Sequence, residues 1–298
     1  MVVSRSIFRV AIISVLVCIG CSTTTVQTRS QHGVSVSLKA NQLDARPPAS
    51  VKYNYPESPR SSLAPLILPG GSTVSIITPD QWLRVARSVQ KDIRALHQNF
   101  SSLYGQIPAS AATVELIESE RFYRTTGAPR WTNAMYYKGK ISIPVPLNKA
   151  IEVDALVRSV RHEYTHSMVH SLSHGKCPGW IDEGIAQMIE GQINPALEPS
   201  LRAWLQVKRP VSLRLLQGGF TKLNSNMVAP AYAQSLYASQ MLLNRFRTGT
   251  LKKYFKHLRS GEHHQEAFEN AFGMSEARFE LVLEKSLNRW AGSEAPLL

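Results

Sequence analysis

The sequence predicts an α+β fold with a small mixed sheet in the N-terminal half and a mainly helical C-terminal half. Alternating apolar and polar residues, typical of strands, occur between residues 72 and 145. From about residue 151 onward, apolar residues recur at helical spacing instead. The chain has 298 residues, 43% of them hydrophobic and 18% charged, so it is long and apolar enough to bury a core.

The first predicted elements are a strand and a long helix. β-branched residues at 72–77 indicate the strand. Thr78 followed by Pro79 indicates the helix start, because a capping residue before a first-turn proline is typical there. We expect the helix to run to about Tyr104, since Gly105 follows.

The remaining elements complete the sheet and build the helical half. A strand is predicted at 112–117, followed by a hairpin of strands 132–137 and 141–145. The connection Lys138-Gly139-Lys140 has the composition of a tight turn. Helices are then predicted at about 151–173, 180–190, 198–207, 230–247, 249–260, 263–271 and 275–290.

Residues 1–21 resemble a secretory signal. Basic residues precede an apolar run at 10–19, which is short for a membrane span. Gly20-Cys21-Ser22 is similar to the end of a bacterial lipobox, which predicts that Cys21 carries lipid and anchors the chain to a membrane. We expect an exported protein, lipid-anchored on the periplasmic side of the bacterial cell envelope or secreted. The same apolar segment also fits a signal-anchored chain.

Composition separates a tether from a folded domain. Proline, serine, threonine and glutamine are frequent at 22–71 and interrupt any regular period, which favours a flexible tether. The single domain is then expected at 72–298. The net charge is +13, but the basic residues are scattered rather than grouped in a nucleic-acid-binding motif. We therefore expect no specific nucleic-acid partner, and general binding of polyanions rests on charge alone.

The predicted helix at 151–173 contains the string His162-Glu163-Tyr164-Thr165-His166. Residues four apart share one face of a helix, so the two imidazoles converge and can share a cation. Glu163 is rotated by about 100° from His162, which places its carboxylate beside the metal rather than on it. A general base for a metal-activated water is needed in that position.

The third ligand must come from another segment, since a catalytic zinc takes three protein groups and leaves one position open. The metzincin pattern is excluded because Val169 and Leu172 stand where it requires Gly and His. A straight helix also carries His170 too far from His162 to share one ion. Glu183, in the short helix that follows Pro178-Gly179, completes a known catalytic set of two histidines and one glutamate.

Together, His162 to His166 and the later segment Pro178-Gly179-Trp180-Ile181-Asp182-Glu183-Gly184-Ile185-Ala186 resemble the gluzincin (peptidase MA) clan, in particular its small peptidase-MA-like domains. The resemblance implies a thermolysin-like arrangement of zinc helices with a sheet edge above them. It also implies one Zn²⁺ per chain on His162, His166 and Glu183, Glu163 as the base, and hydrolysis of a peptide or protein substrate.

Further residues match this family more loosely. Tyr232 lies in a segment similar to a Tyr-containing helix of such domains and is predicted to donate its phenol to the reaction's oxyanion, with Tyr237 as the alternative. Residues 133–136 are expected to form the edge strand that pairs with substrate. Gln187 stands where some gluzincins place a carboxylate that orients a ligating histidine.

The sequence thus predicts a zinc metallopeptidase. Two alternatives belong to other classes. The first is a catalytically inactive, zinc-bearing envelope lipoprotein that acts as a binding module, against which the retention of both Glu163 and Glu183 argues. The second is a polyanion-binding protein, whose retention on an anionic polymer would depend on salt and not on metal.

Overall fold

The structure is a computed structural model that describes residues 58–297 except 129, 131, 148, 192–193 and 221–222. The predicted signal, the lipidation site Cys21 and most of the predicted tether lie outside the described residues, so export and anchoring stay predictions. Within the described part of the chain, no helix is both long enough and apolar enough to cross a bilayer.

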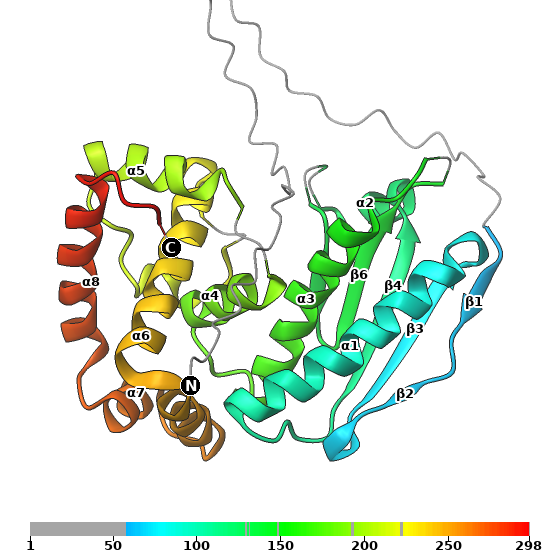
Figure 1. The fold of residues 1–298 in the computed structure, drawn as a ribbon, viewed down its shortest axis with the longest axis horizontal. Helices are drawn as coiled ribbons and strands as arrows, with labels where there is room; N and C mark the ends of the chain where they lie inside the picture. The colour runs from blue at the N-terminus through cyan, green and yellow to red at the C-terminus, as the bar shows by residue number, and fades with distance from the viewer. Residues whose placement is uncertain are drawn as a thin grey trace, which may run out of the picture.

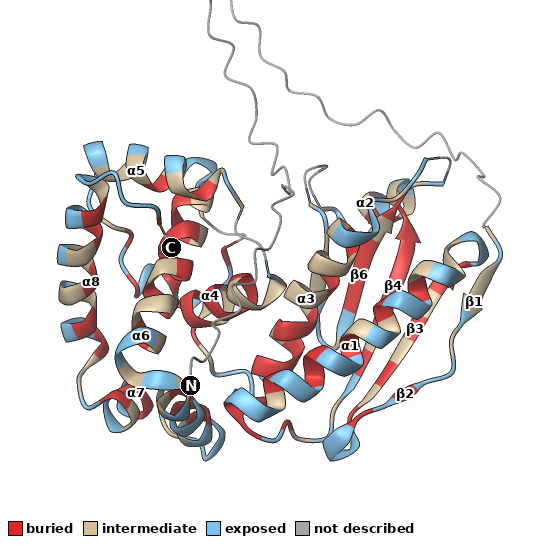
Figure 2. Ribbon diagram, in the orientation of Figure 1, coloured by how far each residue is buried: buried red, intermediate tan, exposed pale blue. Residues whose placement is uncertain are grey.

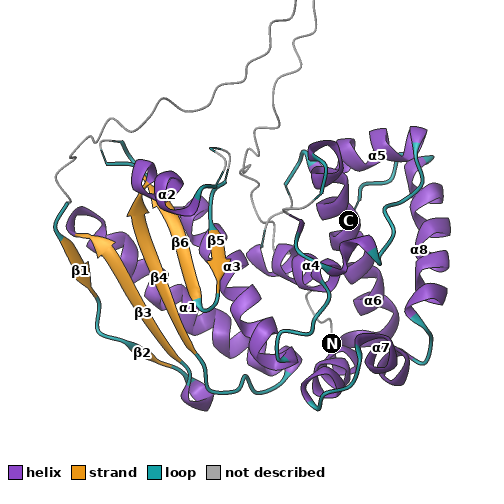
Figure 3. Cartoon of the chain, turned by 180° about the vertical axis from the view of Figure 1, so that it is seen from behind, coloured by secondary structure: helices purple, strands orange, loops and turns teal. Residues whose placement is uncertain are grey.

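The N-terminal half forms a mixed sheet. Its strand order is β1 (Arg60–Ser62), β3 (Thr73–Pro79), β4 (Ala111–Glu118), β6 (Lys140–Val145) and β5 (Met135–Tyr137), and β2 (Leu66–Ile67) also pairs with β3. The central strands β3, β4 and β6 are parallel, and the other pairings are antiparallel. The predicted small mixed sheet is therefore confirmed, and β5 ends it on the side nearest the helical half (Figure 3).

Residues 60–71, which the sequence assigned to the tether, instead contain two short strands of the sheet, β1 and β2. Both β1 and β2 pair with β3, and Leu66 is only 3% exposed. Arg60 also lies 2.6 Å from the buried carboxylate of Glu115 on β4. The prolines of this stretch, which suggested a tether, lie outside these short strands. They leave the main chain of both strands free to pair with β3. The domain therefore begins about twelve residues earlier than the sequence predicted.

The long helix α1 (Leu83–Tyr104) and the hairpin follow the predicted pattern with shifted starts. Thr78 belongs to strand β3, and a 3-10 turn at Asp80–Trp82 separates it from the start of α1. The prediction that Thr78 caps this helix is therefore wrong. Lys138 and Gly139 have φ values of 47° and 80°, as a tight hairpin turn requires. Residues 132–134 do not join β5, and the helix α2 (Ser119–Thr126) was not predicted.

The C-terminal half is helical, as predicted. Figure 1 shows α1 and α3 on one face of the sheet, α4 beside α3, and α6 between α4 and α8. The predicted helices 230–247 and 249–260 are one element that starts at Ser225 and is interrupted at Arg247, where φ is 63°. The elements are α3 (Val153–Ser173), α4 (Gly179–Glu190), α5 (Leu197–Val207), α6 (Ser225–Arg259), α7 (His264–Phe272) and α8 (Glu276–Ala291).

Close packing holds α4 against α6 and α8. A side chain at Gly184 would place its Cβ 2.1 Å from Oγ of Ser239 on α6, so only glycine fits this crossing. At the start of α4, the buried Trp180 stacks on Phe279 of α8 at 5.7 Å between ring centroids. Its indole N–H donates to Glu276 at 2.8 Å. The buried faces of these helices meet in one core (Figure 2), which fixes α4 relative to α3.

Candidate metal centre

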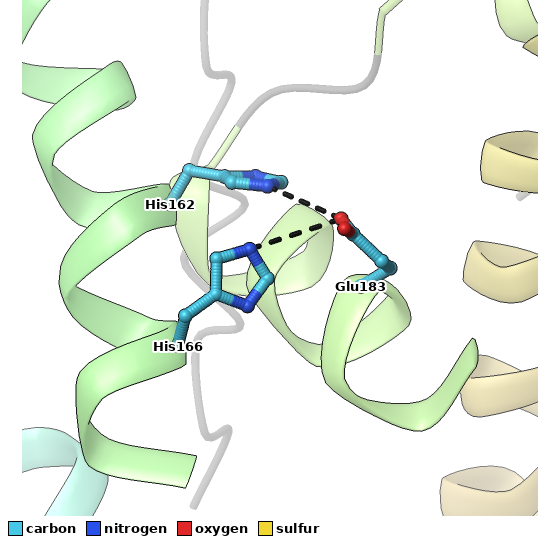
Figure 4. A group of neighbouring side chains, drawn as sticks. All are labelled: His162, His166 and Glu183. Carbon is cyan, nitrogen blue, oxygen red and sulfur yellow. Dashed lines mark ion pairs between the residues drawn. The ribbon is translucent and has the colours of Figure 1, made fainter. Parts of the chain in front are cut away.

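His162, His166 and Glu183 lie together between α3 and α4 (Figure 4). The two histidines come from successive turns of α3, and Glu183 comes from α4. The Oε2 atom of Glu183 lies 3.4 Å from Nε2 of His162 and 3.8 Å from Nε2 of His166. All three candidate ligand atoms fall within 4.8 Å of one another. The arrangement therefore presents two nitrogens and one carboxylate oxygen to a common point.

Carboxylates on α4 hold the other nitrogen of each imidazole. Nδ1 of His162 lies 2.8 Å from Oε2 of Glu190, and Nδ1 of His166 lies 2.9 Å from Oδ1 of Asp182. Such partners fix the ring orientation and direct Nε2 toward a shared ligand. Their positions indicate that both rings are pre-oriented for metal binding.

The centre carries an excess of negative charge. Burial alone would lower the pKa of His162, but Glu183 and Glu190 raise it well above its ordinary value. Burial is likewise outweighed at His166, where Asp182 and Glu183 raise the pKa to about 9. Four acidic side chains, counting Glu163, therefore surround two imidazoles. A cation placed among them would relieve this imbalance.

These residues fit a zinc ion. A tetrahedral zinc with bonds of about 2.1 Å keeps its ligand atoms roughly 3.4 Å apart, close to the two Nε2–Oε2 distances in this centre. Oε2 of Glu183 is also buried without a hydrogen-bond partner. A buried carboxylate oxygen that lacks a donor is costly unless a cation satisfies it. The set of two histidines and one glutamate is one that catalytic zinc uses.

Glu163 lies beside the three candidate ligands rather than among them. Its side chain is half-buried, and this partial burial raises its pKa despite the nearby His162 and His166. The main chain of Tyr136 on β5 hydrogen-bonds to it. A carboxylate with a raised pKa that borders a metal site is suited to accept and return a proton.

The two candidate tyrosines differ in position. The Glu183 carboxylate, followed by burial and the carboxylates of Glu163 and Glu190, raises the pKa of Tyr232 well above its ordinary value, so this phenol lies within electrostatic range of the centre. Tyr237 instead hydrogen-bonds Ser286 of α8 at 2.8 Å and packs near Trp290. The structure therefore brings only Tyr232 of the pair to the candidate site.

Gln187 does not orient a histidine. Its amide nitrogen donates to the main-chain oxygens of Glu183 and Tyr232, at 3.1 and 3.0 Å. The orienting carboxylates are Glu190 and Asp182 instead, which sequence reasoning missed. Glu190 stands seven residues after Glu183 and so shares its helix face, a spacing that was available in the sequence. Asp182 carried no such signal, since its partner depends on how α3 and α4 cross.

Comparison with known proteins places the chain in a family. The profile of the Peptidase MA superfamily matches residues 126–288, which is more than half of the 298 residues. This stretch contains β5, β6, the helices α3 and α4 that carry the candidate ligands, and most of the helical half. The chain belongs to the Peptidase MA superfamily, as the resemblance in its motifs predicted. No curated protein matches it.

Solved structures with similar architecture include larger enzymes. The M1 zinc metallopeptidase of Deinococcus radiodurans is 14% identical, with a TM-score of 0.43, over 80% of this chain and 53% of that one. Aminopeptidase A of Legionella pneumophila, in complex with aspartic acid, is 12% identical, with a TM-score of 0.47, over 76% of this chain and 28% of that one. The chain thus spans about half of the first protein and about a quarter of the second.

Proposed function

We propose that the protein is a zinc-dependent peptidase of the gluzincin type. The observation that carries the proposal is the joint geometry of His162, His166 and Glu183, whose ligand atoms lie within 4.8 Å of one another. Glu190 and Asp182 on α4 support the two imidazoles through their contacts with Nδ1. A zinc ion held there would lower the pKa of a water molecule and polarise the substrate carbonyl.

The chain supplies the proton transfers. Glu163 takes the proton from the attacking water and delivers it to the nitrogen of the leaving amine, because its half-buried carboxyl group has a raised pKa. Tyr232 stays protonated, since its pKa is raised as well, and donates a hydrogen bond to the oxyanion that develops on the carbonyl. No covalent bond between protein and substrate is needed.

The sheet edge provides a place for the substrate main chain. β5 pairs with β6 on one side only and is the last strand of the sheet order. Its Tyr136 contacts the centre through both its main chain and its ring, which lies 6.5 Å from that of His166. An extended peptide that adds to this edge would run across the candidate metal centre.

The test compares zinc content and hydrolysis in the purified domain and two variants. We expect about one zinc per parent chain, and hydrolysis of a peptide library that a chelator abolishes and added zinc restores. Glu163→Gln should keep the zinc and lose roughly 10²–10⁴-fold in rate. Glu183→Ala should lose the zinc itself.

Each outcome has a definite meaning. A Glu163→Gln variant that retains zinc and hydrolyses peptides at the parent rate would overturn the role of Glu163. A parent that binds zinc tightly and cleaves no member of the library supports the inactive binding module instead. A parent that takes up no zinc removes the basis of both.

A further inference from the structure

A second concave site lies outside the metal centre. A cavity of about 640 Å³ opens between the end of α1, the loop at 105–108 and the C-terminal part of α6. Its volume falls in the range of small-molecule sites, which is roughly 300–1,000 Å³. In Figure 1 the end of α1 and the last turns of α6 meet at the lower side of the molecule. None of the candidate zinc ligands lines it.

The floor and one wall of this cavity differ in chemistry. Buried apolar side chains form the floor, among them Tyr104, Ile107, Leu172 and Phe255. The wall is formed by α6, and all the charged side chains that α6 brings to the cavity are cations. These residues are Lys252, Lys253, Lys256 and Arg259, which we call the basic wall.

The cations of the basic wall have no acidic partners. No carboxylate lies within ion-pair distance of any of them in the described part of the chain, and no acidic residue lines the cavity. The whole of α6, from Ser225 to Arg259, contains no aspartate or glutamate. Elsewhere in the molecule, exposed arginines such as Arg130 and Arg209 do pair with carboxylates. The basic wall therefore keeps its positive potential.

The local backbone keeps this wall close to the floor. Gly105 has a φ of 107°, and a Cβ there would lie 3.1 Å from Cε of Lys252. The aliphatic stem of Lys252 therefore lies against the backbone at the end of α1, and its side chain lines the cavity. Cations with apolar stems above an apolar floor match a ligand that has an anionic head and an apolar body.

We propose that this pocket binds a phosphate-bearing group attached to an apolar body. Several ammonium groups and one guanidinium around one cavity favour a multiply charged anion over a single carboxylate. Low-dielectric walls concentrate the field of such a cluster and strengthen anion binding there. The chemistry is shared by soluble phosphate monoesters and phospholipid headgroups. The site is independent of peptide hydrolysis.

The probes are inorganic phosphate, hexyl phosphate and hexanol, titrated by calorimetry into the purified protein. Phosphatidylcholine vesicles with and without phosphatidate test, by sedimentation, whether the ligand is a membrane lipid headgroup.

The pocket variant is Lys252→Glu with Lys256→Glu. The matched control is Lys285→Glu with Arg289→Glu, which makes the same charge change at the same spacing on exposed positions of α8. Lys252→Gln with Lys256→Gln removes the charge without reversing it, in case the reversed variant fails to fold.

Hexyl phosphate should bind more tightly than inorganic phosphate, and hexanol should not bind. The pocket variants should weaken hexyl phosphate by about tenfold or more, and the α8 control by less than about twofold. Loss of binding to phosphatidate vesicles alone, again confined to the pocket variants, would also support the site and assign it to a headgroup. Equal losses in the pocket and control variants would reduce the effect to net charge and overturn the proposal. Absence of binding to every phosphate probe would overturn it as well.

Discussion

The metal centre and the basic wall differ in how their charged side chains are paired and exposed. At the metal centre, carboxylates and imidazoles are half-buried, and each imidazole has a carboxylate partner. On α6, the cations are exposed and have no such partner among the described residues. Buried charge without a partner is costly, whereas exposed charge is screened and cheap to leave unpaired. The contrast agrees with the two proposals, a cation held in the first region and an anion attracted to the second.

This contrast predicts effects of very different size. A change in the metal centre removes a group that acts inside a buried network, so its effect on binding or rate should be large. A change on the basic wall alters screened interactions between exposed groups, so its effect on the free energy of unfolding should be small. The following substitutions test that ranking.

After Glu163 and Glu183, the next largest effect is expected at Tyr232. Tyr232→Phe removes only the phenolic oxygen, and peptide hydrolysis should fall by about 10²–10³-fold if that group stabilises the oxyanion. Zinc content should stay at the parent level, because the phenol is not one of the three candidate ligands. Tyr237→Phe is the matched control and should retain the parent rate, since Tyr237 bonds Ser286 on α8. Equal rates for Tyr232→Phe and the parent would remove Tyr232 from the mechanism.

The next effect is expected for the residues that support the imidazoles. Glu190→Gln and Asp182→Asn keep the shape of the side chains but remove the negative charge next to Nδ1 of His162 and His166. Each should weaken zinc binding by about 10–100-fold, as measured by competition with a chromogenic chelator. Glu266→Gln, on an exposed position of α7, should leave zinc affinity unchanged. Unaltered affinity in both centre variants would show that the rings are oriented by packing alone.

A smaller effect, on stability, is expected at Glu276, which anchors the start of α4. Burial opposes its ionisation, but hydrogen bonds from His264, Trp180 and Gln217 hold its pKa below the ordinary value. Glu276→Gln should lower the free energy of unfolding at neutral pH by about 1–3 kcal/mol, because bonds to a charged acceptor are lost.

The pH dependence of that loss follows from the sign of the shift. A carboxylate with a lowered folded-state pKa contributes its stability above the unfolded-state pKa and loses it as the pH falls through the folded-state value. The difference between parent and Glu276→Gln should therefore be full at pH 6 to 7 and shrink at acidic pH below about 4. Denaturant unfolding at several pH values measures it. A difference that does not vary with pH would show that shape, and not charge, matters there.

The features that could be predicted from the sequence are those that depend on short stretches of the chain. The His162 to His166 string marked its helix face, and Glu183 followed from the need for a third ligand. The turn at Lys138-Gly139 and the end of α1 at Gly105 were also readable, because both require left-handed or unusual φ values. These features depend on residues close together in the sequence.

Features that depend on contacts between distant segments were missed. The strands β1 and β2 exist because β3 offers them an edge, which the proline-rich composition of residues 60–71 concealed. Asp182 supports His166 only because α4 packs beside α3. Gly184 in turn allows the close approach of α4 to α6. The pocket beside the basic wall likewise joins α1 to α6, so scattered lysines in the sequence become one face in the fold.

The smallest effect is expected on the basic wall, where a substitution should stabilise the fold rather than destabilise it. Lys256 lies three or four residues from Lys252, Lys253 and Arg259 along α6, so it faces only like charges. Repulsion between such neighbours costs about 0.2–0.5 kcal/mol per pair. Lys256→Gln should therefore raise the free energy of unfolding by a few tenths of a kcal/mol to roughly 1 kcal/mol at low ionic strength.

Salt separates this explanation from a change in packing. At about 1 M salt the Debye length falls to roughly 3 Å, so the gain from Lys256→Gln should disappear if it comes from relieved repulsion. Arg202→Gln provides the contrast, because Arg202 pairs with Glu198 and donates to main-chain oxygens near the end of α8. That variant should lose stability at either ionic strength. If Lys256→Gln is also destabilising at low salt, the cations of the basic wall stabilise the fold, and their lack of acidic partners no longer indicates a ligand site.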